Sequence, residues 1–259
     1  MGKGPHYVYY GHHKCATTWI RDILQSVCEE LDLRFHVEWL TLSERRFREM
    51  LDRERPDVLA LTNTRVEYPR WLGEGVKGFH VVRDPRDVCV SGYWSHRNSH
   101  PTGHGFTDLD QHRVALRHLP REEGLLAEMA FLRVILRRME KWDYSRPNVL
   151  EVRMEDLTSN PHAGWLQVLG FLGLLGRPDE RTAVRQIPAD RLAEIVESHA
   201  FARLTGGREL GKEDRYSHFR KGISGDWRNY FTPRHVDRFR EKHNTLLRKL
   251  GYETADTWS

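Results

Sequence analysis

A chain of 259 residues with 39% hydrophobic and 10% aromatic residues can bury a sizeable core, and its net charge of +4 suits an anionic small molecule as well as nucleic acid. Its three unevenly spaced cysteines argue against a disulfide framework, and no apolar stretch has the length of a secretory leader or a membrane span. We therefore expect a cytoplasmic protein without a membrane span.

Strand-like and helix-like segments alternate along the chain. Short β-branched and aromatic runs predict strands at 6–10, 33–37, 57–62, 78–82 and 148–152. Apolar residues at helical spacing predict helices at 17–31, 43–53, 122–141, 161–172, 179–185, 190–198 and 233–250, and another after Pro85. Two polar segments, 96–112 and 205–218, are expected to be the least regular. This order favours a single α/β domain, residues 1–259, with a central parallel sheet flanked by helices.

The segment from Gly11 to Trp19 joins the first predicted strand to the first predicted helix. In parallel sheets ligands bind at the carboxyl ends of the strands, and a helix N-terminus there offers free N–H groups to a phosphate. Lys14 adds a positive charge, and Thr17 and Thr18 add hydroxyl donors. The Gly-Lys-Ser/Thr of a Walker loop is absent. The loop is a candidate phosphate site whose ligand stays open.

The same loop contains His12, His13 and Cys15, which allow two other interpretations. Adjacent histidines in a loop point apart and no fourth ligand is close in sequence, so zinc is not favoured and we expect no metal. Thiols at helix N-termini can become nucleophiles because their pKa is lowered. A buried, unreactive thiol packed under the loop is the more frequent arrangement.

Two later segments also place cations beside turns. Arg83 ends a predicted strand and Ser91 lies two turns into the next helix, although a capped helix with a solvated ion pair would explain this segment as well. The segment 220–232 runs two adjacent cations into Gly222, so that side-chain charges and a backbone N–H can converge on one anion. Together with Lys14 these are three cationic clusters, as a nucleotide with phosphates at both ends requires.

The three segments together resemble the cofactor motifs of the sulfotransferase family that uses 3′-phosphoadenosine 5′-phosphosulfate (PAPS). The run from Lys14 to Trp19 is similar to the family's 5′-phosphosulfate loop, which usually reads Lys-x-Gly-Thr-Thr-Trp. Arg83 and Ser91 match its 3′-phosphate pair, and 220–232 is similar to Arg-Lys-Gly-x-x-Gly-Asp-Trp-Lys-Asn-x-Phe-Thr. Segments 154–161 and 198–201 resemble two further family elements, so the resemblance runs from about residue 6 to 250.

The resemblance implies a P-loop-like sulfotransferase fold and a role for each matching residue. Lys14 would be catalytic, because it would neutralise the leaving phosphate as the S–O bond breaks. The 5′-phosphosulfate would be bound by Lys14, Cys15, Ala16, Thr17, Thr18 and Trp19. The 3′-phosphate would be bound by Arg83, Ser91, Arg220, Lys221 and Gly222. Trp19 and Phe201 would hold the adenine between their rings, with PAPS as donor and 3′-phosphoadenosine 5′-phosphate (PAP) as product.

The general base does not follow the family pattern. Many members have a histidine in a segment after the third strand, where this chain has Asn63, and an amide cannot take a proton from an alcohol. Other members resemble one another in placing a glutamate at the end of the second strand, where this chain has His36 and Glu38. Because strand residues alternate between faces, these two share one side. Both are candidate bases, with Glu38 slightly favoured, and a hydrogen-bonded surface pair is the alternative.

We therefore expect sulfuryl transfer from PAPS to an acceptor hydroxyl or amine by in-line displacement, with segment 205–218 as a lid. The expected partner is a small-molecule alcohol, phenol, lipid or sugar, and not nucleic acid; a homodimer is open. Aromatic residues that could line the acceptor pocket are Trp39, Tyr68, Trp71, Tyr93 and Trp94. The main alternative is a P-loop nucleoside or sugar kinase, which would need magnesium and ATP. A second alternative is a module that binds nucleic acid or heparin-like polymers through its basic face.

Overall fold

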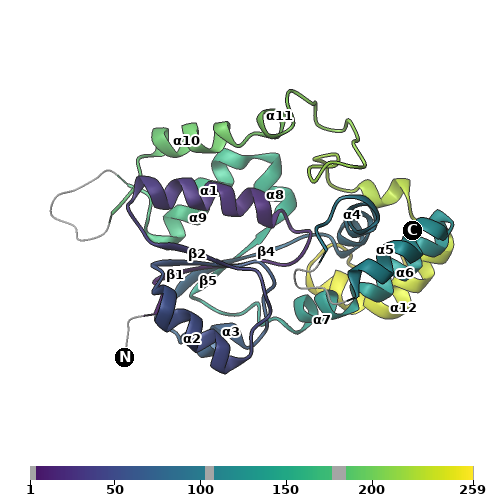
Figure 1. Ribbon diagram of the computed structural model, residues 1–259, viewed down its shortest axis with the longest axis horizontal. Coiled ribbons are helices and arrows are strands. Elements are labelled where there is room, and N and C mark those ends of the chain that lie inside the picture. The colour runs from purple at the N-terminus through teal and green to yellow at the C-terminus, as the bar shows by residue number, and fades with distance from the viewer. Residues whose placement is uncertain (1–3, 103–107, 177–184, 259) are drawn as a thin grey trace. The chain divides into compact units, whose positions relative to one another are not determined.

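The computed structural model describes residues 4–102, 108–176 and 185–258, which fall into two compact units (Figure 1). Unit 1 comprises Met1–Val82 and Asp143–Arg203, and unit 2 comprises Arg83–Trp142 and Leu204–Ser259. The helix predicted at 179–185 lies outside the described residues, except for its last residue, Arg185. Among the described helices, none combines the length and the apolar composition needed to cross a bilayer.

Unit 1 is built on a parallel sheet. Within the described residues its five strands are β1 (Tyr7–Tyr10), β2 (Phe35–Glu38), β3 (Val58–Leu61), β4 (Lys77–Val82) and β5 (Val149–Arg153), in the order β2-β3-β1-β4-β5. Every neighbouring pair is parallel, and Tyr10 is level with both Leu61 and His80. The central strands are almost wholly buried, as expected for a sheet covered on both faces. The parallel α/β sheet and its strands are confirmed.

Helices cover both faces of the sheet (Figure 1). One face carries α1 (Thr17–Glu30), α8 (Met154–Ser159), α9 (Pro161–Leu172) and α10 (Ala189–Ser198), and the other carries α2 (Glu44–Glu54) and α3 (Tyr68–Leu72). Helix α1 buries Ile20, Ile23, Leu24 and Val27, the i, i+3, i+4, i+7 stripe that predicted it. These helices cover the faces of the sheet and not the carboxyl ends of its strands. The candidate phosphate loop lies at that end, between β1 and α1.

Unit 2 contains helices. They are α4 (Pro85–Asn98), α5 (Leu109–His118), α6 (Arg121–Phe131), α7 (Arg133–Lys141) and α12 (Pro233–Lys249), with a short 3-10 helix, η1 (Asp226–Asn229). The short α11 (Phe201–Leu204) spans the boundary between the units. Helix α12 begins as predicted, with Thr232 and His235 forming a reciprocal capping box around Pro233. It ends before Gly251, whose φ of +71° is the left-handed conformation that favours glycine.

Two predictions about unit 2 are wrong. A single helix over 122–141 breaks at Leu132, which has φ −80° and ψ 0° and is fully buried. The apolar periodicity continues through the break without a proline or glycine, so the sequence carried no signal for it. Segment 96–112, which was predicted to be irregular, is helical at both ends, in α4 and α5, because its polar residues His96 and His112 make interior contacts. Its residues 103–107 lie outside the described part of the chain. Segment 205–218 contains no helix or strand, as predicted.

Candidate functional site

The loop between β1 and α1 has a constrained backbone. The N–H of Gly11 donates to the carbonyl of Leu61, 2.7 Å away, and the N–H of Cys15 donates to the carbonyl of His12, 3.1 Å away. Lys14 and Ala16 both have positive φ, +66° and +57°. This left-handed conformation is strained for a residue with a Cβ and comfortable for glycine. Ala16 stands where the family usually has glycine, so the chain keeps the loop shape at a steric cost.

The start of helix α1 is suited to an anion. Its N-cap residue Ala16 has no polar side chain to bond the first N–H groups, and its first turn contains no acidic residue. The positive end of the helix dipole is therefore not offset by a local carboxylate. Lys14, Thr17 and Thr18 are all partly exposed beside it. These features can bind a phosphate or sulfate group.

Cys15 lies beneath this loop rather than on it. Its side chain is fully buried and its Sγ donates toward the carbonyl of His13, 3.8 Å away. Cys15, Cys28 and Cys89 are all buried, and none of the three forms a disulfide. A thiol shielded in this way favours the packing role over the nucleophilic one.

A chain of hydrogen bonds connects the loop after β1 to β5, the strand at one edge of the sheet. His12 Nε2 lies 2.8 Å from His80 Nε2, and His80 Nδ1 lies 2.6 Å from Glu151 Oε2. Both imidazoles are buried, whereas the Glu151 side chain is 26% exposed. Burial lowers the pKa of His80 to about 3. Sequence reasoning missed this chain, because its members are far apart along the sequence and only strand pairing unites them.

The two aromatic residues assigned to adenine belong to neighbouring segments of unit 1. Trp19 Nε1 donates to the carbonyl of His199, 2.9 Å away, two residues before Phe201 begins α11. The Trp19 ring packs edge-on against Trp165, with 6.1 Å between centroids. Trp19 is thus held in the core on one side, and the hydrogen bond brings it next to the segment that carries Phe201.

In unit 2, Asp87 connects the two segments that were assigned to the 3′-phosphate. It lies in the first turn of α4, where its carboxylate accepts the N–H of Gly225 at 2.6 Å and that of Trp227 at 2.8 Å. Ser91 is one helical turn further on, at i+4, and so lies on the same face of α4 as Asp87. Arg83 immediately precedes this helix and is buried. The structure therefore binds the start of α4 to segment 220–232.

The adjacent cations Arg220 and Lys221 are held by carboxylates. Asp226 lies 2.5 Å from both Arg220 Nη2 and Lys221 Nζ, and Glu213 pairs with Arg220. Burial raises the pKa of Asp226, but hydrogen bonds from Lys221, Arg220 and Asn229 outweigh it and leave the pKa lowered. Ionised Asp226 thus fixes both cations beside Gly222, whose φ of +70° is the left-handed conformation that favours glycine. Such a cluster can bind one phosphate.

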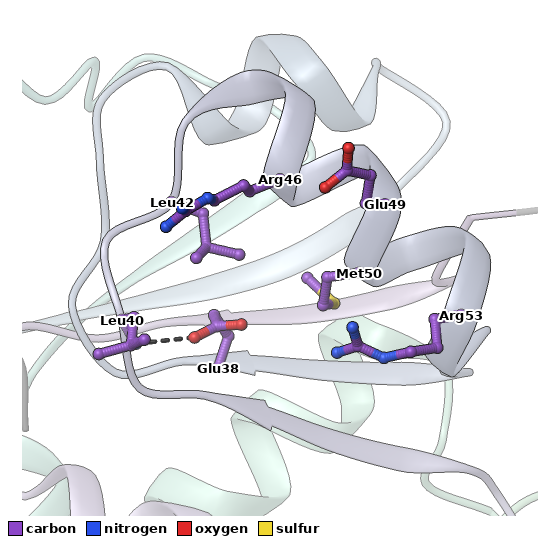
Figure 2. Close-up of a pocket in the computed structure, with 7 residues that line it drawn as sticks. All are labelled: Glu38, Leu40, Leu42, Arg46, Glu49, Met50 and Arg53. Carbon is purple, nitrogen blue, oxygen red and sulfur yellow. Dashed lines mark hydrogen bonds between the residues drawn. The ribbon is translucent and has the colours of Figure 1, made fainter.

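The two base candidates on β2 differ in position. Both face α2, but His36 lies two residues back from the strand end, with its Nδ1 3.7 Å from Glu54 Oε2. Glu38 is the last residue of β2 and its Oε1 accepts the N–H of Leu40 at 2.7 Å. Glu38 also lines an open pocket of about 290 Å³ (Figure 2). The remaining lining residues are Leu40, Leu42, Arg46, Glu49, Met50 and Arg53.

The aromatic residues expected in an acceptor pocket have varied surroundings. Tyr68 is fully buried, stacks on Phe47 and accepts the N–H of Leu42 through its hydroxyl, so it belongs to the core. Trp39 is 44% exposed, with the guanidinium of Arg21 above its ring. Tyr68 is therefore not a pocket residue, and Trp39 is accessible.

Sequence reasoning also missed a buried cluster in unit 2. Glu128 of α6 accepts from His96 Nδ1 and His112 Nε2, each at 2.7 Å. Burial raises the pKa of Glu128, but the two histidines outweigh it and the pKa is lowered. These residue types can bind metals, and their ligand atoms lie within 4.8 Å of one another. Each oxygen of the Glu128 carboxylate accepts a ring N–H from one histidine. The cluster thus serves as a hydrogen-bonded network that joins α4, α5 and α6.

Comparison with known proteins decides the family. The family described as "Sulfotransferase domain" matches residues 5–251, nearly the whole chain. This chain belongs to the sulfotransferase domain family. The resemblance drawn from the three motifs is confirmed, and a kinase is not favoured.

Two curated relatives of this sulfotransferase-family chain are mammalian proteins. Sulfotransferase 1A1 of Canis lupus familiaris is 27% identical over 180 residues, which cover 65% of this chain and 54% of the relative. Sulfotransferase 2A2 of Mus musculus is 26% identical over 174 residues, covering 63% and 53%. The chain spans about half the length of these relatives.

Solved structures confirm the fold. Mouse sulfotransferase SULT7A1 complexed with PAP superposes with a TM-score of 0.62 at 21% identity, covering 97% of this chain and 86% of that one. Retinol dehydratase in complex with androsterone and inactive cofactor PAP gives 0.55 at 17% identity, covering 94% and 81%. The α/β architecture predicted from the sequence is thus the sulfotransferase fold.

Proposed function

We propose that this protein is an enzyme that transfers a sulfuryl group from PAPS to a small-molecule acceptor. The observation that carries the proposal is the anion-suited loop at the carboxyl end of β1, in a chain whose family and fold are those of sulfotransferases. The two solved structures named above are complexes with PAP, which supports PAPS as the donor. The reaction is an in-line displacement: the acceptor oxygen bonds to sulfur, the bond to the 5′-phosphate oxygen breaks, and PAP leaves.

In this proposal the residues assigned to the 5′-phosphate belong to unit 1, and those assigned to the 3′-phosphate belong to unit 2. In unit 1, Lys14 offsets the charge that develops on the leaving phosphate, while Thr17, Thr18 and the N–H groups of the loop bind that phosphate. In unit 2, Arg83, Ser91, Arg220, Lys221 and Gly222 bind the 3′-phosphate, which distinguishes PAPS from ATP. The ion pairs of Asp226 support this role because they hold two cations in place without a further loss of side-chain entropy.

The adenine in this proposal lies against Trp19 and Phe201. A purine offers two apolar faces, and aromatic side chains stack on them readily. The hydrogen bond from Trp19 to the carbonyl of His199 supports the assignment, because it couples the two ring-bearing segments. The lid role of segment 205–218 stays a prediction.

We propose Glu38 as the general base. Strand register puts Glu38 level with Leu61 and Tyr10, two strand spacings or about 10 Å from β1, the strand that leads into the Lys14 loop. A carboxylate at the strand end, lining an open pocket, is better placed to take a proton from an acceptor than an imidazole two residues back against α2. The acceptor in this proposal is an alcohol, phenol, lipid or sugar.

The proposal includes two further expectations. Cationic side chains supply the charge stabilisation that a metal would otherwise give, so turnover should persist in the presence of a chelator. Three buried cysteines that form no disulfide support a reducing, cytoplasmic setting. Whether the chain functions over residues 1–259 as one domain, and whether it forms a homodimer, stay predictions.

The test is a calorimetric titration with PAP and with ATP, each with and without magnesium. We expect PAP to bind with a Kd of about 10 µM or lower and ATP at least about 100-fold more weakly, a difference of roughly 2.7 kcal/mol. Magnesium should change neither result. Failure to bind PAP would refute the proposed function, and magnesium-dependent binding of ATP would favour the kinase alternative.

A further inference from the structure

We propose that His80, oriented by Glu151, is a positioning residue for the phosphate loop: it holds His12, and through it the backbone that follows, in the conformation that binds the 5′-phosphate of the donor. This inference rests on the proposed function. It concerns unit 1 alone, where β1, β4 and β5 are adjacent strands and His80 is directly paired with Glu151.

The hydrogen-bond chemistry of the chain has a defined direction. His80 is neutral at physiological pH because it is fully buried, and it therefore carries a single N–H. The carboxylate of Glu151 can only accept, so this proton is on Nδ1 of His80. His80 Nε2 then carries a lone pair and accepts from the Nε2–H of His12. Glu151 thus sets the tautomers of both imidazoles.

His12 transmits this constraint to the backbone of the loop. Its carbonyl accepts the N–H of Cys15, which closes the turn that contains Lys14. Lys14 and Ala16 are held in left-handed conformations that residues with a Cβ adopt only where their surroundings enforce them. Glycine at position 16 would need no enforcement. A buried anchor at the start of the turn is the kind of constraint that keeps two strained residues in place.

The 5′-phosphate end should depend on this anchor more than the rest of the nucleotide does. The loop N–H groups and Lys14 converge on a phosphate only if the backbone keeps its strained shape. Binding of the 3′-phosphate, by contrast, is assigned to residues of unit 2. Loosening His12 should therefore weaken ligands that carry a 5′-phosphate and leave adenosine 3′-monophosphate unaffected.

Two substitutions of His80 separate the two hydrogen bonds. In His80→Gln the side-chain amide reaches the position of Nε2 and can still accept from His12, whereas in His80→Asn it reaches only the position of Nδ1 and keeps the bond to Glu151. We expect His80→Asn to raise the Kd for PAP about tenfold and to change that for adenosine 3′-monophosphate less than about twofold. His80→Gln should restore PAP binding to within about threefold of the unmodified protein.

A second site and a matched control complete the experiment. His12→Ala removes the same bond from the loop side, and combining it with His80→Asn should weaken PAP binding little more than either change alone, because both break one interaction. Phe79→Leu is the control, since Phe79 is equally buried on the other face of β4 and stacks on Tyr9. It should lower thermal stability without changing the ratio of the two nucleotide affinities.

The outcomes separate this inference from the function it rests on. If the unmodified protein does not bind PAP, the proposed function fails and this inference fails with it. If PAP binds tightly but His80→Asn and His80→Gln behave alike, or both nucleotides weaken together, the positioning role is refuted while the proposed function stands.

Discussion

Asp87 accepts the backbone N–H of Gly225 at 2.6 Å, although 138 residues separate them. The same carboxylate accepts the N–H of Trp227, so the first turn of α4 holds the segment that carries Arg220 and Lys221. One buried acidic side chain thereby ties together the two segments assigned to the 3′-phosphate.

Asp87→Asn should loosen this connection. An amide offers one acceptor atom instead of two, and its NH₂ group would face a backbone N–H, at a cost of about 1–3 kcal/mol. We expect the Kd for PAP to rise about tenfold or more and that for adenosine 5′-monophosphate to stay within about twofold. Asp110→Asn, an exposed change at the start of α5, is the control. Equal weakening of both nucleotides would contradict the assignment of this segment to the 3′-phosphate.

Ala16→Gly should stabilise the protein. Ala16 has φ +57°, which costs a residue with a Cβ about 1 kcal/mol, whereas glycine adopts it freely. A gain of about 1 kcal/mol corresponds to a rise in Tm of roughly 2–4 °C for a chain of this size. Differential scanning calorimetry would measure it. A lower Tm would show that the methyl group contributes packing that outweighs the strain.

Lys14→Ala should abolish most of the turnover while partly sparing binding of the donor. If Lys14 offsets charge that develops only as the S–O bond breaks, its loss lowers kcat by about 10²–10³-fold and raises the Kd for PAP much less. The rate is measured by sulfuryl transfer from PAPS to an acceptor found by screening phenols, alcohols and sugars. Lys141→Ala, an exposed change at the end of α7, is the control. Full activity in Lys14→Ala would remove Lys14 from the mechanism.

Glu38→Gln and His36→Gln test the general base. Loss of a general base lowers kcat by about 10²-fold or more. Glutamine keeps the shape of glutamate, and in place of histidine its amide reaches the position of Nε2 without being able to take the proton. We expect that loss in Glu38→Gln and a change below about threefold in His36→Gln, because His36 contacts Glu54 rather than the strand end. The reverse pattern would transfer the role to His36. Similar small effects would mean that neither residue is the base.

His80 should make stability depend on pH. Its pKa is about 3 in the folded protein, against about 6.5 in an unfolded chain, so between these values only the unfolded state takes the proton. The free energy of unfolding should therefore fall as pH decreases below about 6.5, by up to about 1.4 kcal/mol per pH unit, and this contribution is complete above that pH. Urea denaturation at pH 7 and pH 5 would measure it. His80→Gln should reduce the difference, and an unchanged pH dependence in that variant would contradict the assignment.

Much of the fold was predictable because its signals are local. Five short apolar runs predicted the strands of the parallel sheet, and caps such as Thr232-Pro233 marked helix starts. The break at Leu132 was not predictable, since nothing in the apolar spacing around it differs from a continuous helix. The helical ends of segment 96–112 were not predictable for a related reason. From the sequence alone, a histidine that bonds to a buried carboxylate such as Glu128 cannot be distinguished from a histidine on an exposed loop.

The sequence by itself determined the family and the candidate donor residues. Phosphate recognition uses backbone N–H groups and cations within a few residues of each other, so Lys14 to Trp19 and Arg220 to Gly222 are legible as motifs. Only the tertiary structure decided what holds those residues. Asp87 reaches Gly225, and His12 reaches Glu151 through His80, across separations of tens of residues or more. Such contacts depend on which elements pack together, and strand order and helix packing are properties of the whole chain.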